Sequence, residues 1–167
     1  MSERVLCRWA TRWDREALIA HLGELMHFHG EEPDLDTLRQ SLEYALKYPE
    51  RVRLAVAQRG DKVVGCMSLH DCYSTWRAMP FGQIQDVFIV EEERGSGMAQ
   101  ELFEFTVAEA MRRHYCRIDL EVLESNSRAR AFYEKMGMKW GECLTYSMRL
   151  GGMANSLLPP SEGGGNG

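Results

Sequence analysis

The chain has 167 residues, of which 44% are hydrophobic and 27% are charged, and its formal net charge is −5. These values are typical of one globular domain with a core of ordinary size, and they argue against a protein that binds nucleic acid through a basic surface. No apolar run approaches the roughly 18 residues of a membrane-spanning helix, and the first residues do not resemble a signal peptide. We therefore expect a cytoplasmic protein with no nucleic-acid or membrane partner.

The first third of the chain predicts one strand and two helices. Val5–Trp9 is expected to be a strand, and Asp14 is expected to cap a helix that runs to about Phe28. Residues 30–36 are acidic and contain a proline, which predicts a loop. Leu35–Lys47 then repeats apolar residues at helical spacing.

Two strands follow, over Arg53–Gln58 and Lys62–His70, and Gly60-Asp61 between them predicts a tight hairpin turn. Asp71–Gly82 is expected to be a long connection that carries aromatic residues. These aromatic residues, Trp76 above all, either pack against their own domain or line a substrate pocket.

The second half predicts a strand at Gln83–Val90, a helix at Gly97–His114, a strand at Arg117–Leu123 and a helix at Ser127–Met136 that Gly137 ends. The residues expected to be buried in the helix over 97–114 are Ala99, Phe103, Val107, Ala110 and Met111.

Strands at Met138–Gly141 and Leu144–Leu150 are expected to complete a domain over residues 1–150. Residues 151–167 are rich in glycine and proline and predict a low-complexity tail. The order β-α-α-β-β-β-α-β-α-β-β predicts the α/β class, with a mixed sheet and helices on both faces.

The five cysteines are scattered and include no Cys-x-x-Cys pair, which predicts reduced thiols rather than a disulfide framework or a zinc site. They are Cys7, Cys66, Cys72, Cys116 and Cys143. His27 and His29 lie two residues apart without an evident third ligand, so we expect no metal site.

The stretch Ile84–Phe105 is the most informative part of the chain. An apolar strand passes through three glutamates into Arg94–Ala99, which contains two glycines, and then directly into a helix. Backbone N–H groups at such a turn, together with the helix dipole, favour a bound phosphate, and glycine lets the phosphate approach the main chain. The turn contains neither Gly-Lys-Ser/Thr nor Gly-x-Gly-x-x-Gly, which excludes the two common nucleotide-binding fingerprints.

The spacing Arg94-x-x-Gly97-x-Ala99 resembles the acetyl-CoA-binding motif of the GNAT superfamily of N-acetyltransferases. Residues 126–138 resemble a later segment of that family, Asn-x-x-Ala-x-x-Phe-Tyr-x-x-x-Gly-Phe, in the right order and at about the right distance. The resemblance extends over about residues 5–150. It implies the GNAT fold, in which two central parallel strands splay apart and admit the pantetheine arm of acetyl-CoA.

The resemblance also implies a set of cofactor-binding residues. Backbone N–H groups of the turn would hold the pyrophosphate, and free main-chain groups of the strand before it would pair with the pantetheine amides and polarise the thioester carbonyl. Asn126 and Ala129 would contact the cofactor from the other side. The full set is Val87, Phe88, Ile89, Val90, Arg94, Gly95, Ser96, Gly97, Met98, Ala99, Gln100, Asn126 and Ala129.

The family tyrosine that protonates the leaving thiolate corresponds to Tyr133, although packing against Phe132 would also explain this residue. The general base is less defined. Related polyamine and thialysine acetyltransferases often have Glu-Asp where this chain has Gln85-Asp86, and glutamine cannot accept a proton. Asp86 and Glu121 are the remaining candidates, while structural hydrogen bonds for both, or a water chain without a single base, are equally open.

We expect an enzyme that moves the acetyl group of acetyl-CoA to a primary amine by direct attack in a ternary complex, and the family resemblance also suggests a homodimer. A small cationic acceptor is favoured by the net charge, by Asp71 and by the acidic loop, and Tyr73–Trp76 resembles the diamine and polyamine branch. The loop's carboxylates are Glu31, Glu32, Asp34 and Asp36. Two alternatives are a non-catalytic acetyl-CoA-binding module and an acetyltransferase of a protein N-terminus or lysine.

Overall fold

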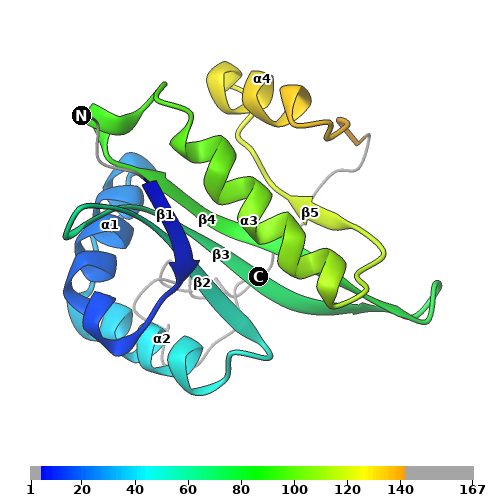
Figure 1. The fold of residues 1–167 in the computed structure, drawn as a ribbon, viewed down its shortest axis with the longest axis horizontal. Coiled ribbons are helices and arrows are strands. Elements are labelled where there is room, and N and C mark those ends of the chain that lie inside the picture. The colour runs from blue at the N-terminus through cyan, green and yellow to red at the C-terminus, as the bar shows by residue number, and fades with distance from the viewer. Residues whose placement is uncertain (1–4, 142–167) are drawn as a thin grey trace, which may run out of the picture. The chain divides into compact units, whose positions relative to one another are not determined.

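The computed structural model describes residues 5–141 (Figure 1), and the chain divides into two compact units between Arg130 and Ala131. The first unit contains a five-stranded sheet in the order β1-β2-β3-β4-β5, in which β4 and β5 are parallel and the other neighbours are antiparallel. The predicted mixed α/β class is therefore confirmed. The strands are β1 (Val5–Trp9), β2 (Val52–Arg59), β3 (Lys62–Ser74), β4 (Met79–Ile89) and β5 (Ile118–Leu120). The helices are α1 (Arg15–Phe28), α2 (Leu35–Lys47), α3 (Met98–Arg112) and α4 (Ser127–Lys135), with 3-10 turns at Arg12–Asp14 and Glu91–Glu93.

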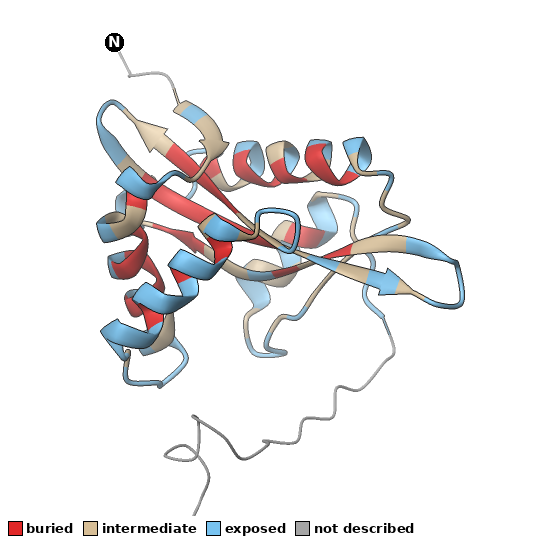
Figure 2. Cartoon of the chain, turned by 90° about the horizontal axis from the view of Figure 1, so that it is seen from below, coloured by how far each residue is buried: buried red, intermediate tan, exposed pale blue. Residues whose placement is uncertain are grey.

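Helices α1 and α2 cover one face of the sheet and α3 covers the other, as Figures 1 and 2 show. The α1/α2 face holds a contiguous apolar cluster to which alternate residues of the strands contribute, because successive strand side chains point to opposite faces. The cluster consists of Leu18, Ile19, Leu22, Leu38, Leu42, Ala45, Leu54, Val56, Cys66 and Phe88. Helix α2 has the predicted bounds. It buries Leu38, Leu42 and Ala45, at the i, i+4 and i+7 spacing expected of an amphipathic helix.

Asp14 does not cap α1 as predicted. It directly precedes the helix, but no side-chain capping bond is present. Its carboxylate is 4% exposed and instead accepts hydrogen bonds from the Arg8 guanidinium at 2.7 and 2.8 Å and from the Thr11 N–H at 2.7 Å. Because a bidentate guanidinium binds a carboxylate strongly, Arg8 on β1, rather than the first amides of α1, decides the orientation of Asp14.

The buried stripe of α3 is also shifted from the predicted one. Phe103 and Ala110 are buried as expected, whereas Met111 is 72% exposed and its neighbour Glu109 is only 7% exposed. Ala99 and Val107 are partly buried. Met98, Leu102 and Thr106 complete the buried face. The buried face of α3 therefore includes Glu109, which the apolar pattern did not mark, and leaves out Met111.

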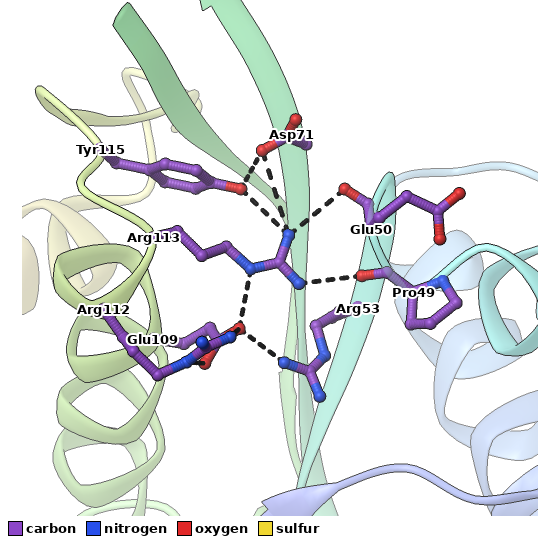
Figure 3. Close-up of polar contacts among 8 residues, drawn as sticks. All are labelled: Pro49, Glu50, Arg53, Asp71, Glu109, Arg112, Arg113 and Tyr115. Atoms are coloured by element: carbon purple, nitrogen blue, oxygen red, sulfur yellow. Dashed lines mark hydrogen bonds and ion pairs between the residues drawn. The ribbon is translucent and has the colours of Figure 1, made fainter.

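Guanidinium groups explain why Glu109 can be buried. Its carboxylate accepts hydrogen bonds from Arg53 at 2.5 Å, Arg112 at 2.8 Å and Arg113 at 2.7 Å (Figure 3). Hydrogen bonds from Arg112, then Arg113 and Arg53, outweigh the effect of burial and lower the pKa of Glu109 to about 2.

Arg113 connects this helix to other parts of the unit. It donates to the carbonyl oxygens of Pro49 at 3.0 Å and Glu50 at 3.2 Å, and it lies beside Tyr115, whose hydroxyl also contacts Asp71 (Figure 3). Hydrogen bonds and ion pairs thus connect the end of α3 to β2, β3 and the segment before β2.

The predicted long connection between the central strands is wrong. β3 continues to Ser74 and β4 starts at Met79, so most of Asp71–Gly82 is an extended hairpin with a turn at residues 75–78. Figure 2 shows the hairpin reaching beyond the helices, with an exposed tip. Trp76 is 98% exposed and Tyr73 is 62% exposed, so neither packs into the core.

Near the other end of the chain, β5 covers only the middle of the predicted strand Arg117–Leu123. Met138–Gly141 forms no strand, contrary to the prediction. Strand structure depends on a pairing partner, which local sequence does not reveal. Leu144–Leu150, the predicted tail and Cys143 lie outside the described residues.

Candidate active site

A β-bulge interrupts the middle of β4. Met67 pairs with Val87, and Leu69 pairs with Ile84, so two steps along β3 match three along β4. The extra residue lies at Gln85-Asp86. The Gln85 amide nitrogen is 3.4 Å from the Gln83 side-chain oxygen, which places both glutamines on one face of the strand.

The parallel pairing of β4 with β5 ends close to the bulge, at the pair Ile84–Leu120. β4 continues for five further residues, which include the predicted cofactor-binding residues Val87, Phe88 and Ile89, and Val90 follows the strand. Phe88 and Ile89 have buried side chains, so the backbone is the part of these residues that a ligand could reach.

Arg94 ties the turn back to this strand. The Val90 N–H donates to Val64 O in β3 at 2.9 Å, and the C=O and N–H of one trans peptide point in opposite directions. The Ile89 carbonyl therefore faces away from β3, and Arg94 Nε donates to it at 3.0 Å. Arg94 thus contributes its side chain to the turn's geometry, a role that the motif alone did not predict.

The turn before α3 has the backbone conformation that glycine permits. Gly95 and Gly97 have φ angles of 84° and 91°, in the left-handed region, and no atom lies within 4 Å of the position that a Cβ would occupy at either residue. The Ser96 hydroxyl donates to Glu93 O at 2.7 Å. The Glu93 carboxylate in turn accepts hydrogen bonds from Arg59 at 2.6 and 2.9 Å, which hold its pKa below the usual range.

Helix α3 begins at this turn without a side-chain cap on Gly97. The first N–H groups of a helix, here those of Met98, Ala99 and Gln100, have no carbonyl partner one turn earlier. Met98 is 1% exposed and anchors the helix, whereas the Gln100 side chain is exposed and donates to Glu104 at 2.9 Å. Unpaired amides, a positive helix end and open space beside two glycines fit a diphosphate group.

The second predicted motif has two parts. Asn126 Oδ1 accepts the Ala129 N–H at 3.1 Å, so the asparagine caps α4. Tyr133 is 9% exposed, its ring lies 5.1 Å from that of Phe132, and burial raises its pKa to about 12. A phenol with this pKa is protonated at neutral pH. Cofactor contacts by Asn126 and Ala129, and acid catalysis by Tyr133, remain predictions.

The predicted bases occupy different environments. Asp86 lies in the bulge, is partly buried, and donates its N–H to Ser68 Oγ at 2.9 Å. Glu121 directly follows β5 and is exposed. No described contact assigns a catalytic role to either carboxylate, and both stay candidates.

Sequence reasoning missed two polar residues next to the bulge. Ser68 is 1% exposed, and His70 Nε2 lies 3.2 Å from its hydroxyl. Burial lowers the pKa of His70, while the charge of Asp86 acts in the opposite direction. The signal that could have found them was the recurrence of polar residues at every second position of an otherwise apolar strand. Between residues 5 and 141 the structure holds no group of three potential metal ligands and no helix that is long and apolar enough to cross a membrane.

A model of the acetyltransferase (GNAT) family matches residues 12–138, which is most of the chain. The chain belongs to the GNAT acetyltransferase family. The resemblance inferred from the two motifs is therefore confirmed, and the chain is an acetyl-CoA-dependent acyltransferase. Its similarity to the diamine branch stays a prediction.

Solved structures agree with this assignment. A possible acetyltransferase from Clostridium difficile 630 is 25% identical, with a TM-score of 0.79 over 89% of this chain and 99% of that one. A Trypanosoma brucei acetyltransferase is 21% identical, with a TM-score of 0.68 over 89% and 99% of the two chains. The ribosomal-protein-alanine N-acetyltransferase of Brucella melitensis biovar Abortus 2308 is 17% identical, with a TM-score of 0.72 over 89% and 100%. The last two comparisons support the fold alone.

Proposed function

We propose that this GNAT enzyme acetylates the primary amine of a small cationic molecule by direct attack on acetyl-CoA in a ternary complex. The observation that supports this most is the continuity of one strand. Within β4 and the turn after it, the bulge at Gln85-Asp86, the backbone beyond the β5 pairing and the glycines of the α3 turn follow one another. In chain order, the bulge would suit the amine, the strand backbone would suit the thioester arm, and the glycine turn would suit the diphosphate.

In this proposal the cofactor is held mainly by main-chain groups. The N–H groups of residues 94–100 would bind the diphosphate, and the backbone of Val87–Val90 would pair with the pantetheine amides. Acetyl-CoA supplies the thioester whose carbonyl the amine attacks. One strand N–H would donate to that carbonyl oxygen as negative charge develops on it.

The reaction requires the acceptor nitrogen to lose two protons and the leaving thiolate to gain one. The acceptor ammonium must lose a proton before its nitrogen can form the new N–C bond, and the C–S bond then breaks to leave a thiolate. Tyr133, protonated because burial raises its pKa to about 12, would supply the proton to that sulfur. The second proton lost by the nitrogen passes to solvent, and solvent returns a proton to Tyr133.

Fewer carboxylates are available to attract a cationic acceptor than the sequence suggested. Asp34 accepts from the Asp36 N–H and from Thr37, Asp36 pairs with Arg39 at 3.0 Å, and Asp71 contacts Tyr115. These carboxylates stabilise their own surroundings. The carboxylates that remain to attract a cation are those of the exposed residues Glu31 and Glu32 together with the partly buried Asp86.

A panel of diamines, polyamines, amino acids and peptides with free N-termini, assayed for CoA release at matched concentration, tests the proposal. A small polycation should be the best acceptor, and its kcat/KM should fall as salt screens the carboxylates. Preference for a neutral amine would refute the cationic acceptor, and preference for a peptide would support the protein N-terminus alternative. Binding of acetyl-CoA without transfer to any amine would instead support the non-catalytic module. The cytoplasmic location and the homodimer remain predictions from the sequence.

A further inference from the structure

We propose that His70 is the general base of the transfer and that Ser68 holds its imidazole in the tautomer with the proton on Nε2. This inference rests on the proposed amine acetylation. His70 occupies a strand position that the sequence motifs did not mark. His70 is the third of three alternating residues on β3, after Cys66 and Ser68, and it is partly exposed where Cys66 and Ser68 are buried.

Strand register places His70 on the same face as the bulge residues. It pairs with Val52 and Gln83, while Ser68 pairs with Leu54, a member of the apolar cluster beneath α1 and α2. Asp86 lies two residues before Phe88, another member of this cluster. Directly paired and alternate residues of a sheet share a face. His70, Ser68 and Asp86 therefore all lie on the α1/α2 face.

Hydrogen bonds connect His70 to the bulge. Ser68 Oγ accepts the Asp86 N–H at 2.9 Å, which fixes the position of the oxygen, and His70 Nε2 is 3.2 Å from that oxygen. With Nε2–H donating to the second lone pair of Ser68 Oγ, Nδ1 keeps its own lone pair. Nδ1 is then the nitrogen that takes a proton from the acceptor.

The groups around His70 keep it in its neutral form. Burial lowers its pKa, and the opposing charge is that of Asp86 on β4. The partner on β2 is Val52, α2 turns apolar residues to this face, and the buried His21 of α1 contacts Val63 near the start of β3. Cys66 is uncharged, because burial raises its pKa to about 12. Asp71, the next residue along β3, bonds to Tyr115 and faces α3 instead.

The proposed proton transfer balances. The ammonium gives one proton to His70 Nδ1, the neutral nitrogen attacks the thioester carbon, and the C–S bond breaks. The nitrogen loses its second proton to water, Tyr133 gives its proton to the thiolate and regains one from water, and the imidazolium returns its proton to water. An imidazole suits this task at neutral pH better than a carboxylate does, because a general base is most effective when its pKa lies near the working pH.

The test compares His70→Gln with His114→Gln, which makes the same chemical change at a residue after the end of α3. His70→Gln should lower kcat/KM for the best acceptor by about 10²-fold or more, with unchanged acetyl-CoA affinity, and should remove the acid limb of the pH profile. His114→Gln should keep the wild-type kcat/KM and the acid limb. A His70→Gln enzyme that retains the limb, while the wild type is active, would refute the base assignment alone; a wild type that acetylates no amine would refute the proposed function with it.

Nitrogen-15 NMR of the imidazole in the intact wild type gives a result that does not depend on the folding of a variant. We expect the proton of the neutral ring on Nε2 and a ring pKa below the ordinary value of about 6.5. Ser68→Ala should shift both the tautomer ratio and the acid limb. A ring with the proton on Nδ1, or one that Ser68→Ala leaves unchanged, would overturn the proposal.

Discussion

Two polar clusters, one on each face of the sheet, are held in different ways. On the α3 face, Glu109 is surrounded by guanidinium groups, and Asp71 contacts both Tyr115 and Arg113. On the α1/α2 face, Asp86 and His70 form no ion pair with any residue between 5 and 141 and have only one linking hydroxyl, that of Ser68. A buried charge with several partners serves the architecture, whereas a partly buried group with a free lone pair can act on a ligand.

The greatest separation of activity from stability is expected at Tyr133 of α4, in the second unit. Tyr133→Phe should lower kcat by about 10²–10⁴-fold, because no other group is proposed to protonate the thiolate. The loss of one hydroxyl should cost about 1 kcal/mol of unfolding free energy or less. Steady-state kinetics and urea unfolding measure the two effects. A kcat within twofold of the wild type would show that Tyr133 only packs.

Glu109→Gln should show the opposite pattern. It leaves guanidinium groups around a neutral amide and should lower the free energy of unfolding by about 3 kcal/mol, with kcat nearly unchanged. Glu104→Gln, at an exposed position of the same helix, is the matched control. Equal stability of the two variants would contradict the architectural role of the cluster.

The stability of the wild type and of Glu109→Gln should also depend differently on pH. The pKa of Glu109 is lowered from 4.5 to about 2, so its contribution to stability is complete above pH 4.5 and is lost as pH falls toward 2. The wild type should therefore lose more stability than Glu109→Gln over this range. Urea unfolding at several pH values measures the difference. The same change in unfolding free energy with pH in both proteins would show that the Glu109 carboxylate does not stabilise the fold in this way.

A smaller effect is expected at the glycine turn. Gly97→Val should weaken acetyl-CoA binding at least tenfold, about 1.4 kcal/mol, because a branched side chain would occupy the space that the diphosphate needs. Gly30→Val is the control, since Gly30 also has a left-handed φ of 77° and open space within 4 Å of the point where a Cβ would lie. Calorimetry should find weaker binding only for Gly97→Val. Equal affinities in folded variants would remove the turn from the cofactor site.

The smallest effect is expected at the tip of the β3–β4 hairpin. Trp76 is 98% exposed, so Trp76→Ala should change the free energy of unfolding by less than about 0.5 kcal/mol. We also expect unchanged kcat/KM for the acceptor. A large loss of kcat/KM with normal stability would show that the hairpin takes part in acceptor binding, as the sequence left open.

Local patterns were sufficient for much of the secondary structure. β1 and α2 have the predicted bounds, and the Gly60-Asp61 hairpin joins β2 to β3 as expected. Each of these elements is encoded within a few neighbouring residues by apolar periodicity or turn chemistry. The glycines of the α3 turn were recognised for the same reason, because the left-handed backbone there favours glycine whatever surrounds it.

Only the tertiary structure decided which polar residues meet. The burial of Glu109, the pairing of Asp14 with Arg8 and the side chain of Arg94 on Ile89 O depend on groups that other elements bring within reach. The bulge at Gln85-Asp86 depends on the register of β4 against β3, and it brings the Asp86 N–H to the Ser68 hydroxyl that His70 also contacts. By itself the sequence determined most of the elements, the family and the glycines of the turn before α3, because these depend on local patterns. The fold decided the pairing of Glu109 with Arg53 and the approach of Asp86 to Ser68, because helix packing and strand register join residues far apart in the chain.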